Sequence, residues 1–477
     1  MSPEQTQKDA GQGQLSRSLS HRQMTMIALG LAVGTGLFLG SGDAIAIAGP
    51  AVIVSYAIGS LIAAIIAACT GEMAVRYPVR GGFGTIAGRY LGPYAGYMTR
   101  WAYWATMVPL AGAELVAVGK YMGYWYPQLP LWIWVLISGL LILGLNLFSV
   151  KSFGSTEFLL SSIKVTAVAV FILFGLIFVF FGLPGVEPAG LANLTDHGFM
   201  PQGPASIWLA LAVVMFSFGG IELVSISAAE AKDPVRSVRV SAKAMMYRLA
   251  TFYVLAIFVV LCMVPWQQAA QLEGEVSTSP FVLVFSALHI PYIAGITNFV
   301  VMTAALSGAN AALYAATRQI HALAHDHMAP GILARTSKNG IPILGLAVSM
   351  LGSVVAVIMA ITEVANIFVM MMSLVTVCVL VVWAMILLSY LKFKAVEGNS
   401  SPFRVFAGRY SASLGLIGVL ATFVAMFFAR DMAIPASVGL GFFAFITLVY
   451  YALVRKYQSF DDSAFEQSRQ QLEKPQA

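Results

Sequence analysis

The chain has 477 residues, of which 59% are hydrophobic and only 10% are charged, and its formal net charge is +6. A soluble globular domain carries about 25% charged residues. Together with a mean hydropathy of +0.82, this composition excludes a soluble domain and indicates a protein that crosses the membrane several times. The first 22 residues are polar without a cleavable signal peptide. Cys69, Cys262 and Cys378 lie in apolar runs and predict neither a disulfide framework nor a metal site.

Twelve apolar runs have about 20 residues or more, the length needed to cross the hydrocarbon core as a helix. Because backbone groups in lipid must be hydrogen-bonded within the protein, each run is predicted to be α-helical. An even number of crossings places both termini on the same side. The predicted spans are 24–47, 51–75, 95–125, 131–150, 157–182, 205–229, 246–266, 292–317, 342–361, 364–391, 411–429 and 434–454.

Lysine and arginine alternate between successive connections. One set of connections, together with both termini, holds almost all basic residues, whereas the opposite set holds little beyond Lys120 and Arg430 and carries acids instead. The positive-inside rule therefore predicts cytoplasmic N- and C-termini in an inner-membrane protein. A nucleic-acid surface would cluster its charge on one face of one domain, so nucleic acid is not an expected partner.

Two connections are longer than turns. Residues 231–248 begin with Asp-Pro and carry five basic residues, which favours an amphipathic helix on the cytoplasmic surface. Residues 266–285 form the longest outer connection, and their apolar end favours a lid that packs back on the bundle. Elsewhere His321 and His325 lie four residues apart, as metal ligands can, but a solvated cytoplasmic stretch is the simpler interpretation.

The first span is interrupted by five glycines in ALGLAVGTGLFLGSG, residues 28–42. Each glycine destabilises a helix by roughly 1 kcal/mol relative to alanine, so this run predicts a break, with close helix packing as the alternative. The sixth span carries a matching interruption, Gly219-Gly220 in VVMFSFGGIELVSISAAE. Five crossings leave the chain on the opposite side of the membrane, because five is odd. A second set of five spans therefore starts from that side and runs in the opposite orientation. Matching interruptions in two such halves are typical of a transporter substrate site.

A broken helix offers both kinds of group that an amino acid zwitterion needs. N–H groups at a half-helix N-terminus favour a carboxylate, and Thr35, Gly36 and Leu37 are expected to supply them. Freed carbonyl oxygens accept from an ammonium group, and glycine lets the ligand approach the backbone. The carbonyls expected in this role belong to Phe216, Ser217 and Phe218.

From about Leu19 to Lys394 the chain carries HRQMTMIALGLAVGTGLFLGSG, GEMAVRYPVRGGF, GRYLGPYAGYMTRWAYW, NLFSVKSFGSTEF, MFSFGGIELVSISAAEAKDP and NAALYAATRQIHALAHDHMAP. In this order the motifs resemble the amino acid permease family of bacteria and fungi, within the amino acid–polyamine–organocation superfamily. The resemblance implies an all-α fold of 12 spans, with two inverted five-helix repeats (spans 1–5 and 6–10) and two peripheral helices. It also implies amino acid uptake, generally coupled to protons. The corresponding segments are a tail at 1–22, repeats at 23–182 and 183–391, peripheral spans at 392–456 and a tail at 457–477.

Several side chains near the breaks are candidate substrate contacts. Glu114 lies near the middle of span three, where an unpaired charge costs at least about 2.5–3.5 kcal/mol. A buried structural acid is the alternative for Glu114, and a link between helices is the alternative for Glu222. One phenylalanine beside the break is expected to cover the substrate, with core packing as the alternative. The predicted substrate-binding residues are Val33, Thr35, Gly36, Leu37, Glu114, Phe216, Ser217, Phe218, Gly219, Gly220 and Glu222.

The expected pocket wall is small and mostly apolar, and it includes Gly112 and Gly308. This character favours neutral amino acids as substrates. Some segments resemble permeases for aromatic amino acids and others resemble 4-aminobutyrate permeases. Outside the pocket, Glu72 at the end of span two is expected to pair with a nearby arginine.

Lys164, in SSIKVTAVAVFILFG, is the predicted coupling residue and lies seven residues into span five. Its long stem can carry the ammonium group to the lipid headgroups, which is the structural alternative. The functional interpretation, supported by the resemblance, places the amine between spans one, five and eight, where sodium-coupled relatives of the fold hold a cation. The proton is then the coupling ion, sodium is not required and no cofactor is expected.

Other classes of function fit less well. A channel needs a continuous polar lining or a carbonyl filter, and an enzyme needs a nucleophile with a base, a metal cluster or a phosphate loop; the sequence offers none of these. An amino acid exchanger, a sodium-coupled symporter and a non-transporting amino acid sensor on the same fold are the alternatives. The chain is therefore predicted to be a proton-coupled amino acid permease and not an enzyme, with its oligomeric state left open.

Overall fold

The computed structural model describes residues 34–79, 81–148, 150–182, 187–196, 198–222, 251–270, 279–287, 292–337, 341–398, 401, 403–429, 431–456 and 465. Regular structure in these residues is helical, with no β-strand among them. The N-terminal tail, Val33 and the amphipathic helix predicted over 231–248 lie outside the described residues.

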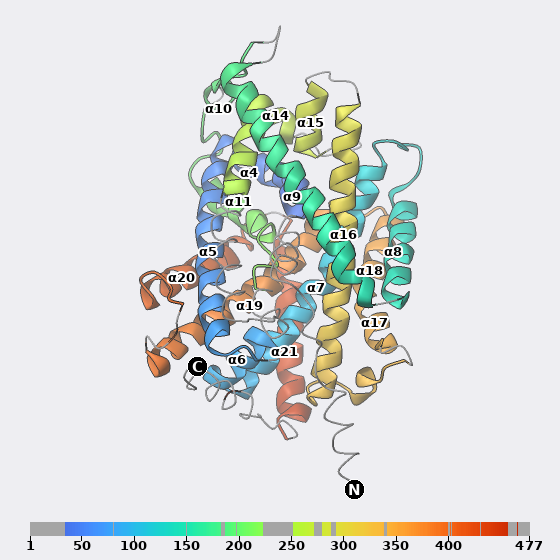
Figure 1. Ribbon diagram of the computed structural model, residues 1–477, viewed down its shortest axis with the longest axis vertical. Helices are drawn as coiled ribbons and strands as arrows, with labels where there is room; N and C mark the ends of the chain where they lie inside the picture. The colour runs from blue at the N-terminus through green and yellow to red at the C-terminus, as the bar shows by residue number, and fades with distance from the viewer. Residues whose placement is uncertain are drawn as a thin grey trace, which may run out of the picture.

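The longer helices form a bundle in which most run roughly upright in the view of Figure 1, while α19 and α20 cross it obliquely. They are α5 (Val52–Arg76), α7 (Pro93–Met122), α8 (Leu131–Phe148), α9 (Val150–Phe181), α11 (Ala205–Phe216), α16 (Ile293–His325), α18 (Leu351–Ile361), α19 (Ile367–Glu397), α20 (Arg409–Ala425) and α21 (Ala433–Val449). Shorter helices lie between or beside them. They are α3 (Thr35–Phe38), α4 (Gly40–Ala48), η1 (Gly49–Ala51), α6 (Gly82–Leu91), α10 (Ala192–Thr195), α14 (Trp266–Ala270), α15 (Pro280–Ala287), η2 (Gly331–Ala334), α17 (Ile343–Ser349) and η3 (Tyr450–Val454).

Seven helical stretches among the described residues are long and apolar enough to cross a membrane. They are Gly40–Arg76, Pro93–Met122, Glu157–Phe181, Ile293–His325, Ile343–Ile361, Ile367–Glu397 and Ala433–Val454. Shorter apolar helices cover Leu131–Leu147, Ala205–Phe216, Thr251–Met263 and Arg409–Ala425. The stretch Gly40–Arg76 contains both α4 and α5 and therefore corresponds to the first two predicted spans. Each of the other predicted spans corresponds to one of the remaining stretches or shorter apolar helices. The fold is that of a polytopic membrane protein, while the number of crossings and the inverted repeat stay predictions.

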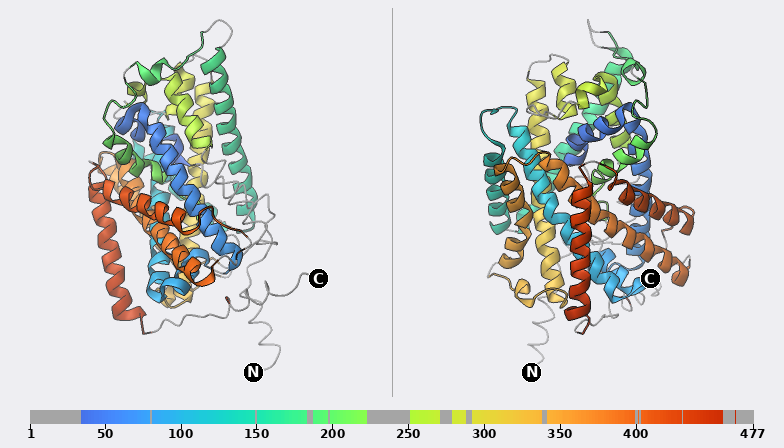
Figure 2. Two further views of the ribbon diagram at one scale, coloured as in Figure 1. Left: turned by 90° about the vertical axis from the view of Figure 1, so that its left-hand side faces the viewer. Right: turned by 180° about the vertical axis from the view of Figure 1, so that it is seen from behind.

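Helix α7 is the axis of the bundle, and α16 and α19 pack most extensively against it. In the most apolar window of α7, 89% of the residues are buried inside the protein, whereas the corresponding share for Ala433–Val454 is 28%. Figure 2 shows α21 standing at the edge of the bundle. The last helix therefore contributes little to the centre, as expected for a peripheral span.

Three elements differ from the predicted boundaries. Helix α9 begins at Val150 rather than at residue 157, because the polar residues before 157 continue the helix. Lys164 therefore lies about four turns inside the helix instead of about two. Helix α6, which contains three glycines, was not predicted. The ninth predicted span is divided into α17 and α18 at Met350.

The connection over residues 266–285 packs back on the bundle, as predicted for its described part. The Ser279 hydroxyl donates to the carbonyl oxygen of Phe38 at the end of α3. The ring of Phe281 in α15 lies edge-on to Phe38, with centroids 5.1 Å apart, and 4.6 Å from the ring of Phe171 in α9. This connection therefore joins the first broken helix to α9.

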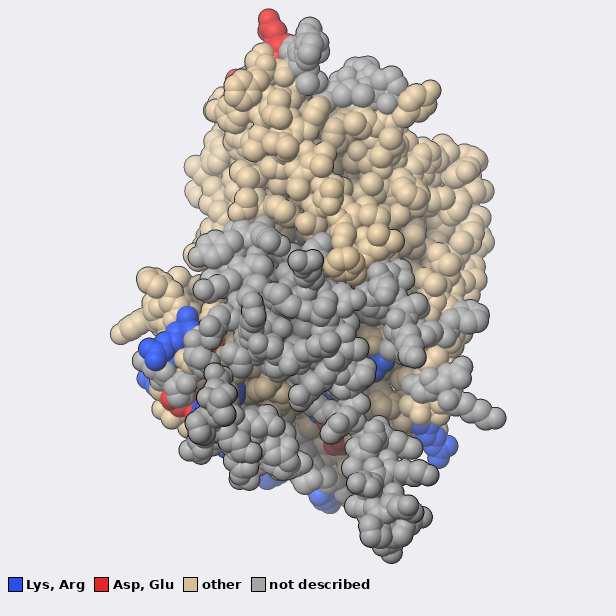
Figure 3. Space-filling model, in the orientation of Figure 1, with Lys and Arg blue, Asp and Glu red and all other residues tan. Residues whose placement is uncertain are grey.

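Charged side chains gather toward one end of the molecule. On the face drawn in Figure 3, the lysines and arginines lie in the lower half, toward the end occupied by α6 and by the C-terminal end of α16 in Figure 1. The upper half of this face is almost free of basic side chains. This asymmetry agrees with the predicted orientation, in which the basic end is cytoplasmic.

Candidate functional site

The first predicted break lies at Gly34. This residue has extended backbone angles, φ −125° and ψ −162°, and α3 begins directly after it at Thr35. The first amides of a helix have no acceptor within the helix, so Thr35 and Gly36 present N–H groups here. The N–H of Leu37 donates to the Gly34 carbonyl at 3.2 Å and is already engaged in this conformation. A helix N-terminus thus lies within the predicted glycine-rich segment, whose part before Gly34 lies outside the described residues.

The second predicted break follows α11. That helix ends at Phe216, and residues 217–222 form successive turns instead of continuing the sixth span. Gly220 has φ +99°, a conformation that residues with a side chain rarely adopt. The paired glycines therefore mark the position at which the helix is interrupted.

The two breaks touch each other. A Cβ atom built on Gly36 would lie 2.6 Å from the Cα of Ser217 and 2.9 Å from Cδ1 of Phe216. A side chain at position 36 cannot fit without displacing the second break. Glycine at this position allows two backbone segments, 180 residues apart in sequence, to meet in the interior of the bundle.

The carbonyl groups at the second break are partly engaged. The phenolic hydroxyl of Tyr253, in the helix Thr251–Met263, donates to the Ser217 carbonyl at 2.6 Å. The Phe216 carbonyl accepts from the Gly219 N–H at 3.1 Å. Each carbonyl oxygen has two lone pairs, so each still has the capacity for one further donor. Tyr253 could not be predicted from the sequence, because its role depends on a contact between distant segments.

Phe216 and Phe218 face different surroundings. Phe218 is fully buried and packs against Tyr253, with ring centroids 4.6 Å apart, and against Tyr56. Phe216 lies against Gly36 and edge-on to Phe368 of α19, with ring centroids 6.1 Å apart. The contacts place Phe216 at the junction of the two breaks and Phe218 in the core behind it.

Glu114 reaches the first break from α7. A Cβ atom on Gly34 would lie 3.1 Å from its Oε1 atom, and one on Gly308 of α16 would lie 2.7 Å from its carboxyl carbon. Glu114 is 4% exposed, and its Oε2 atom has no hydrogen-bond partner in the described part of the chain. The same carboxyl group faces the hydroxyl and N–H groups of Thr35, and the Ser217 side chain faces the phenol of Tyr56. These polar groups converge on the meeting point of the breaks, where a polar ligand would satisfy the Oε2 atom.

Glu222 occupies a different environment. One carboxylate oxygen accepts from the Gly220 N–H at 3.2 Å, and the other accepts from Nε1 of Trp383 in α19 at 3.1 Å. These bonds fix the turn after α11 to α19. The contacts therefore favour the structural interpretation of Glu222, a link between helices.

Lys164 forms a buried ion pair with Glu157, which the sequence analysis did not single out. Its Nζ atom lies 3.8 Å from Oε1 of Glu157, and each side chain is 1% exposed. Ser307 of α16 donates to the two carboxylate oxygens of Glu157 at 2.7 and 2.8 Å, and Ser161 donates to Oε1 at 3.3 Å. The ammonium group thus ends on a buried carboxylate and not at the protein surface. The sequence held a signal for this pair, because Glu157, Ser161 and Lys164 share one helical face.

Two expectations about buried positions were wrong. Glu72 pairs with Lys394 at 2.9 Å and accepts from Tyr390, so its partner is a lysine of α19 and not a nearby arginine. Gly112 does not line the junction, because a Cβ atom there would lie 2.6 Å from the Gly352 carbonyl oxygen of α18. Gly112 is instead a point of close crossing between α7 and α18.

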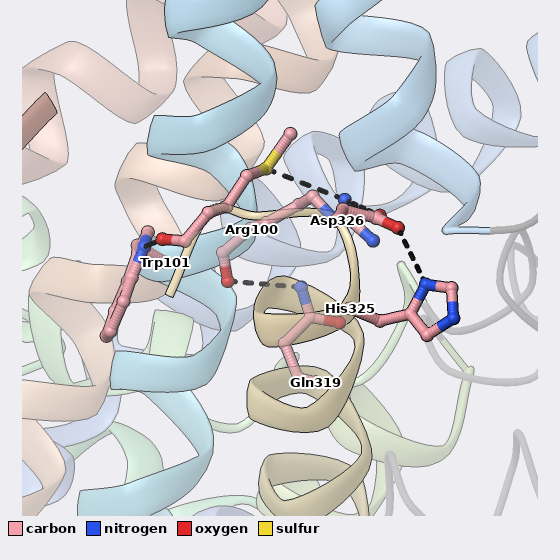
Figure 4. Close-up of polar contacts among 6 residues, drawn as sticks. Arg100, Trp101, Gln319, His325 and Asp326 are labelled. Atoms are coloured by element: carbon pink, nitrogen blue, oxygen red, sulfur yellow. Dashed lines mark hydrogen bonds and ion pairs between the residues drawn. The ribbon is translucent and has the colours of Figure 1, made fainter. Parts of the chain in front are cut away.

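The basic end of α7 is fastened to the loop after α16 (Figure 4). The guanidinium group of Arg100 pairs with the carboxylate of Asp326 at 2.5 Å, and Trp101 donates to the Met328 carbonyl at 3.1 Å. His325 lies 3.6 Å from the other Asp326 oxygen, and His321 contacts the Ala334 carbonyl. In the described residues, no group of three His, Cys, Asp or Glu side chains is placed to hold a metal ion.

A second contact at this end involves Glu397, near the end of α19. The hydroxyl of Tyr77 donates to its Oε1 atom at 2.8 Å, and that of Tyr90 in α6 does so at 3.2 Å. Burial, followed by the interactions with Glu397, raises the pKa of Tyr77 above its usual value. Both phenols therefore stay protonated as donors, and they hold α6 beside α19.

The sequence comparisons identify the family of the chain. The family model for amino acid permeases matches residues 23–461. The aromatic amino acid transport protein AroP of Escherichia coli O6:H1 is 41% identical over 385 residues, which is 80% of this chain and 83% of AroP. Two proteins of Bacillus subtilis strain 168 are 36% identical: the uncharacterized amino acid permease YtnA, over 92% of this chain and 95% of YtnA, and the probable threonine/serine transporter YbxG, over the same shares. The matching family consists of transporters and not of enzymes.

Proposed function

This chain belongs to the amino acid permease family, and on that premise we propose that it takes up neutral amino acids together with protons by alternating access. The proposal has three parts: the place where the substrate binds, the ion that drives its uptake, and the class of substrate. Each part is supported by different contacts in the bundle.

The contact between Gly36 and Ser217 is the observation that carries the proposed binding site. The amides of Thr35 and Gly36 would bind the substrate carboxylate at a half-helix N-terminus. The second-break carbonyls would accept from the substrate ammonium group a few ångströms away. The buried Oε2 atom of Glu114, which has no partner among the described residues, supports this location, because buried polar groups are normally hydrogen-bonded.

Alternating access would move the helices of one half past those of the other around this fixed site. The contacts between Arg100 and Asp326 and between Tyr77 and Glu397 support a conformation in which the basic end is closed. Uptake then requires these contacts to open after the substrate has bound. With the basic end in the cytoplasm, the substrate would leave on that side.

Lys164 supports proton coupling because a fixed ammonium group can replace a bound sodium ion. Its side chain is buried with a carboxylate partner, which argues against the headgroup alternative. An amine can release and regain a proton in each transport cycle, whereas a sodium site needs a shell of oxygen ligands. We therefore expect transport without sodium.

Neutral substrates are favoured by the apolar surroundings of the junction. Phe216 and Phe368 would contact the substrate side chain or the region just beside it. The names of AroP and YbxG point to aromatic amino acids for one relative and to threonine and serine for another. For this chain we propose neutral amino acids as a class, with 4-aminobutyrate as the compound that tests the requirement for an α-ammonium group.

The experiment is a competition panel in cells that lack their own permeases. Uptake of radiolabelled phenylalanine and threonine is measured against an excess of each of the common amino acids and of 4-aminobutyrate. Neutral amino acids are expected to compete, and Glu114→Gln is expected to change the rank order of competitors. Competition by arginine and lysine alone would contradict the proposed substrate class.

A further inference from the structure

The Glu157–Lys164 pair connects α9 of the first predicted repeat to α16 of the second. Ser307 makes this connection, since its hydroxyl donates to both oxygens of Glu157. The next residue, Gly308, lies against the carboxyl group of Glu114 at the substrate site. One turn of α16 therefore touches both the ion pair and the acid beside the first break.

The charge of the pair depends on one proton. With Lys164 protonated, the ammonium and the Glu157 carboxylate carry no net charge. Without that proton, the amine is neutral and a carboxylate charge stays buried without a cationic partner. An unpaired buried charge is much more costly than a paired one. Burial alone disfavours an ammonium group, and the nearby Glu157 carboxylate, 3.8 Å from Nζ, is what favours the protonated amine in this conformation.

This inference rests on the proposed proton coupling. We propose that Glu157 positions Lys164 and makes the proton affinity of its amine depend on the conformation of the bundle. Movement of α16 would withdraw Ser307 from Glu157 and admit water to the carboxylate. Water then stabilises the charge of the Glu157 carboxylate in place of the ammonium group. An N–H bond of Lys164 then breaks, its electron pair stays on the amine, and the proton passes to a water molecule on the open side.

Glu114 of α7 is the other titratable group that acts electrostatically on Lys164. The polar side chains that contact Glu157 among the described residues are Ser307 of α16 and Ser161 of α9 itself, besides Lys164. One amine therefore lies between two carboxylates with different contacts. Both acids contact α16, but Glu114 lies beside Gly308, which has no side chain to donate, whereas Glu157 accepts a hydrogen bond from the Ser307 hydroxyl and would lose it when α16 moves.

The test compares two transport modes in proteoliposomes that contain purified protein. Exchange of external radiolabelled substrate for internal substrate needs no net movement of protons. Accumulation in response to an imposed pH gradient does need it, and one pH unit supports about tenfold accumulation for one proton per substrate. Glu157→Gln is expected to keep exchange and to lose this accumulation. Ser307→Ala, which keeps the pair but removes a donor to Glu157, leaves the carboxylate more dependent on the ammonium group and is expected to reach half-maximal uptake at a less acidic outer pH.

A double variant, Glu157→Gln with Lys164→Met, removes the pair without leaving an unpaired charge. If the pair only stabilises the fold, the double variant is expected to regain gradient-driven accumulation. If the pair carries the coupling, the double variant folds, exchanges substrate and stays uncoupled. Full accumulation by Glu157→Gln, in a preparation where the wild type is driven by the gradient, would overturn this inference alone. A wild type that ignores the gradient would instead overturn the proposed coupling.

Discussion

Gly36 lies so close to Ser217 that a Cβ atom on the glycine would fall 2.6 Å from the serine Cα. Real Cβ atoms do not approach backbone atoms to this distance, so even an alanine must push the two breaks apart. The contact joins the described parts of the first and sixth predicted spans, where α3 begins and where α11 ends. The binding of substrate is expected to depend on it.

Gly36→Ala is therefore expected to weaken substrate binding severely and Gly36→Leu to abolish it. Gly219→Leu is expected to abolish binding for a different reason. Its Cβ would meet only the Phe216 carbonyl, at 3.4 Å, so the larger side chain would enter the space proposed for the substrate. Binding is measured by isothermal calorimetry or scintillation proximity on purified protein.

The matched control is Gly144→Leu in α8, where a Cβ would meet nothing within 4 Å. This variant is expected to bind substrate normally, since a helical glycine that faces open space loses nothing by substitution. Unchanged affinity in Gly36→Leu would place the substrate site elsewhere.

The two phenylalanines at the second break should respond differently to substitution. Phe218→Ala is expected to lower stability by about 3–5 kcal/mol, because it removes a fully buried ring from a packed aromatic cluster. Phe216→Ala is expected to change the affinity for substrate with a smaller loss of stability. Thermal unfolding and substrate binding measured on the same samples separate the two effects. Equal loss of binding at equal stability in both variants would argue against the assignment of Phe216 to the site.

These contacts show which parts of the site the sequence could predict. Both breaks follow from glycines, since glycine weakens helices wherever it occurs. The different roles of Phe216 and Phe218 do not follow, because they depend on the path of the chain through an irregular turn. Glu157 was overlooked because it borders an apolar run, where an acid usually lies at the membrane surface. The continuation of α9 back to Val150 places it in the interior instead.

The Arg100–Asp326 pair is expected to help keep the basic end of the bundle closed. Asp326 is 43% exposed, so the pair contributes roughly 1 kcal/mol or less. Asp326→Asn should therefore raise the labelling rate of a cysteine at the buried position Ser349 by up to about fivefold. Membrane-permeant maleimide is the reagent, and the three buried natural cysteines give the background.

His325→Ala is the control for this variant. His325 is 77% exposed and contacts the same carboxylate, but it makes no contact with Arg100. It should leave labelling at position 349 unchanged. An unchanged rate in Asp326→Asn would show that the pair does not contribute to closure.

The orientation of the bundle can be tested on two exposed loop residues that flank α17 and α18. Thr336 lies at the basic end, and Thr362 lies at the opposite end of this pair of helices. A cysteine at Thr362 is expected to react with an impermeant maleimide in intact cells. A cysteine at Thr336 should react only after the membrane is opened. The reverse pattern would invert the predicted topology.

Lys164→Ala gives the most direct test of the whole account. Purified wild-type protein is placed in sodium-free proteoliposomes whose outer solution is made more acidic than the interior. Accumulation of a radiolabelled neutral amino acid is then measured with and without a protonophore. The wild type should concentrate substrate, by about tenfold per pH unit for one proton per substrate, and the protonophore should abolish this. Lys164→Ala should equilibrate substrate without concentrating it. A wild type that needs sodium, or a Lys164→Ala variant that still concentrates substrate along the proton gradient, would contradict the account.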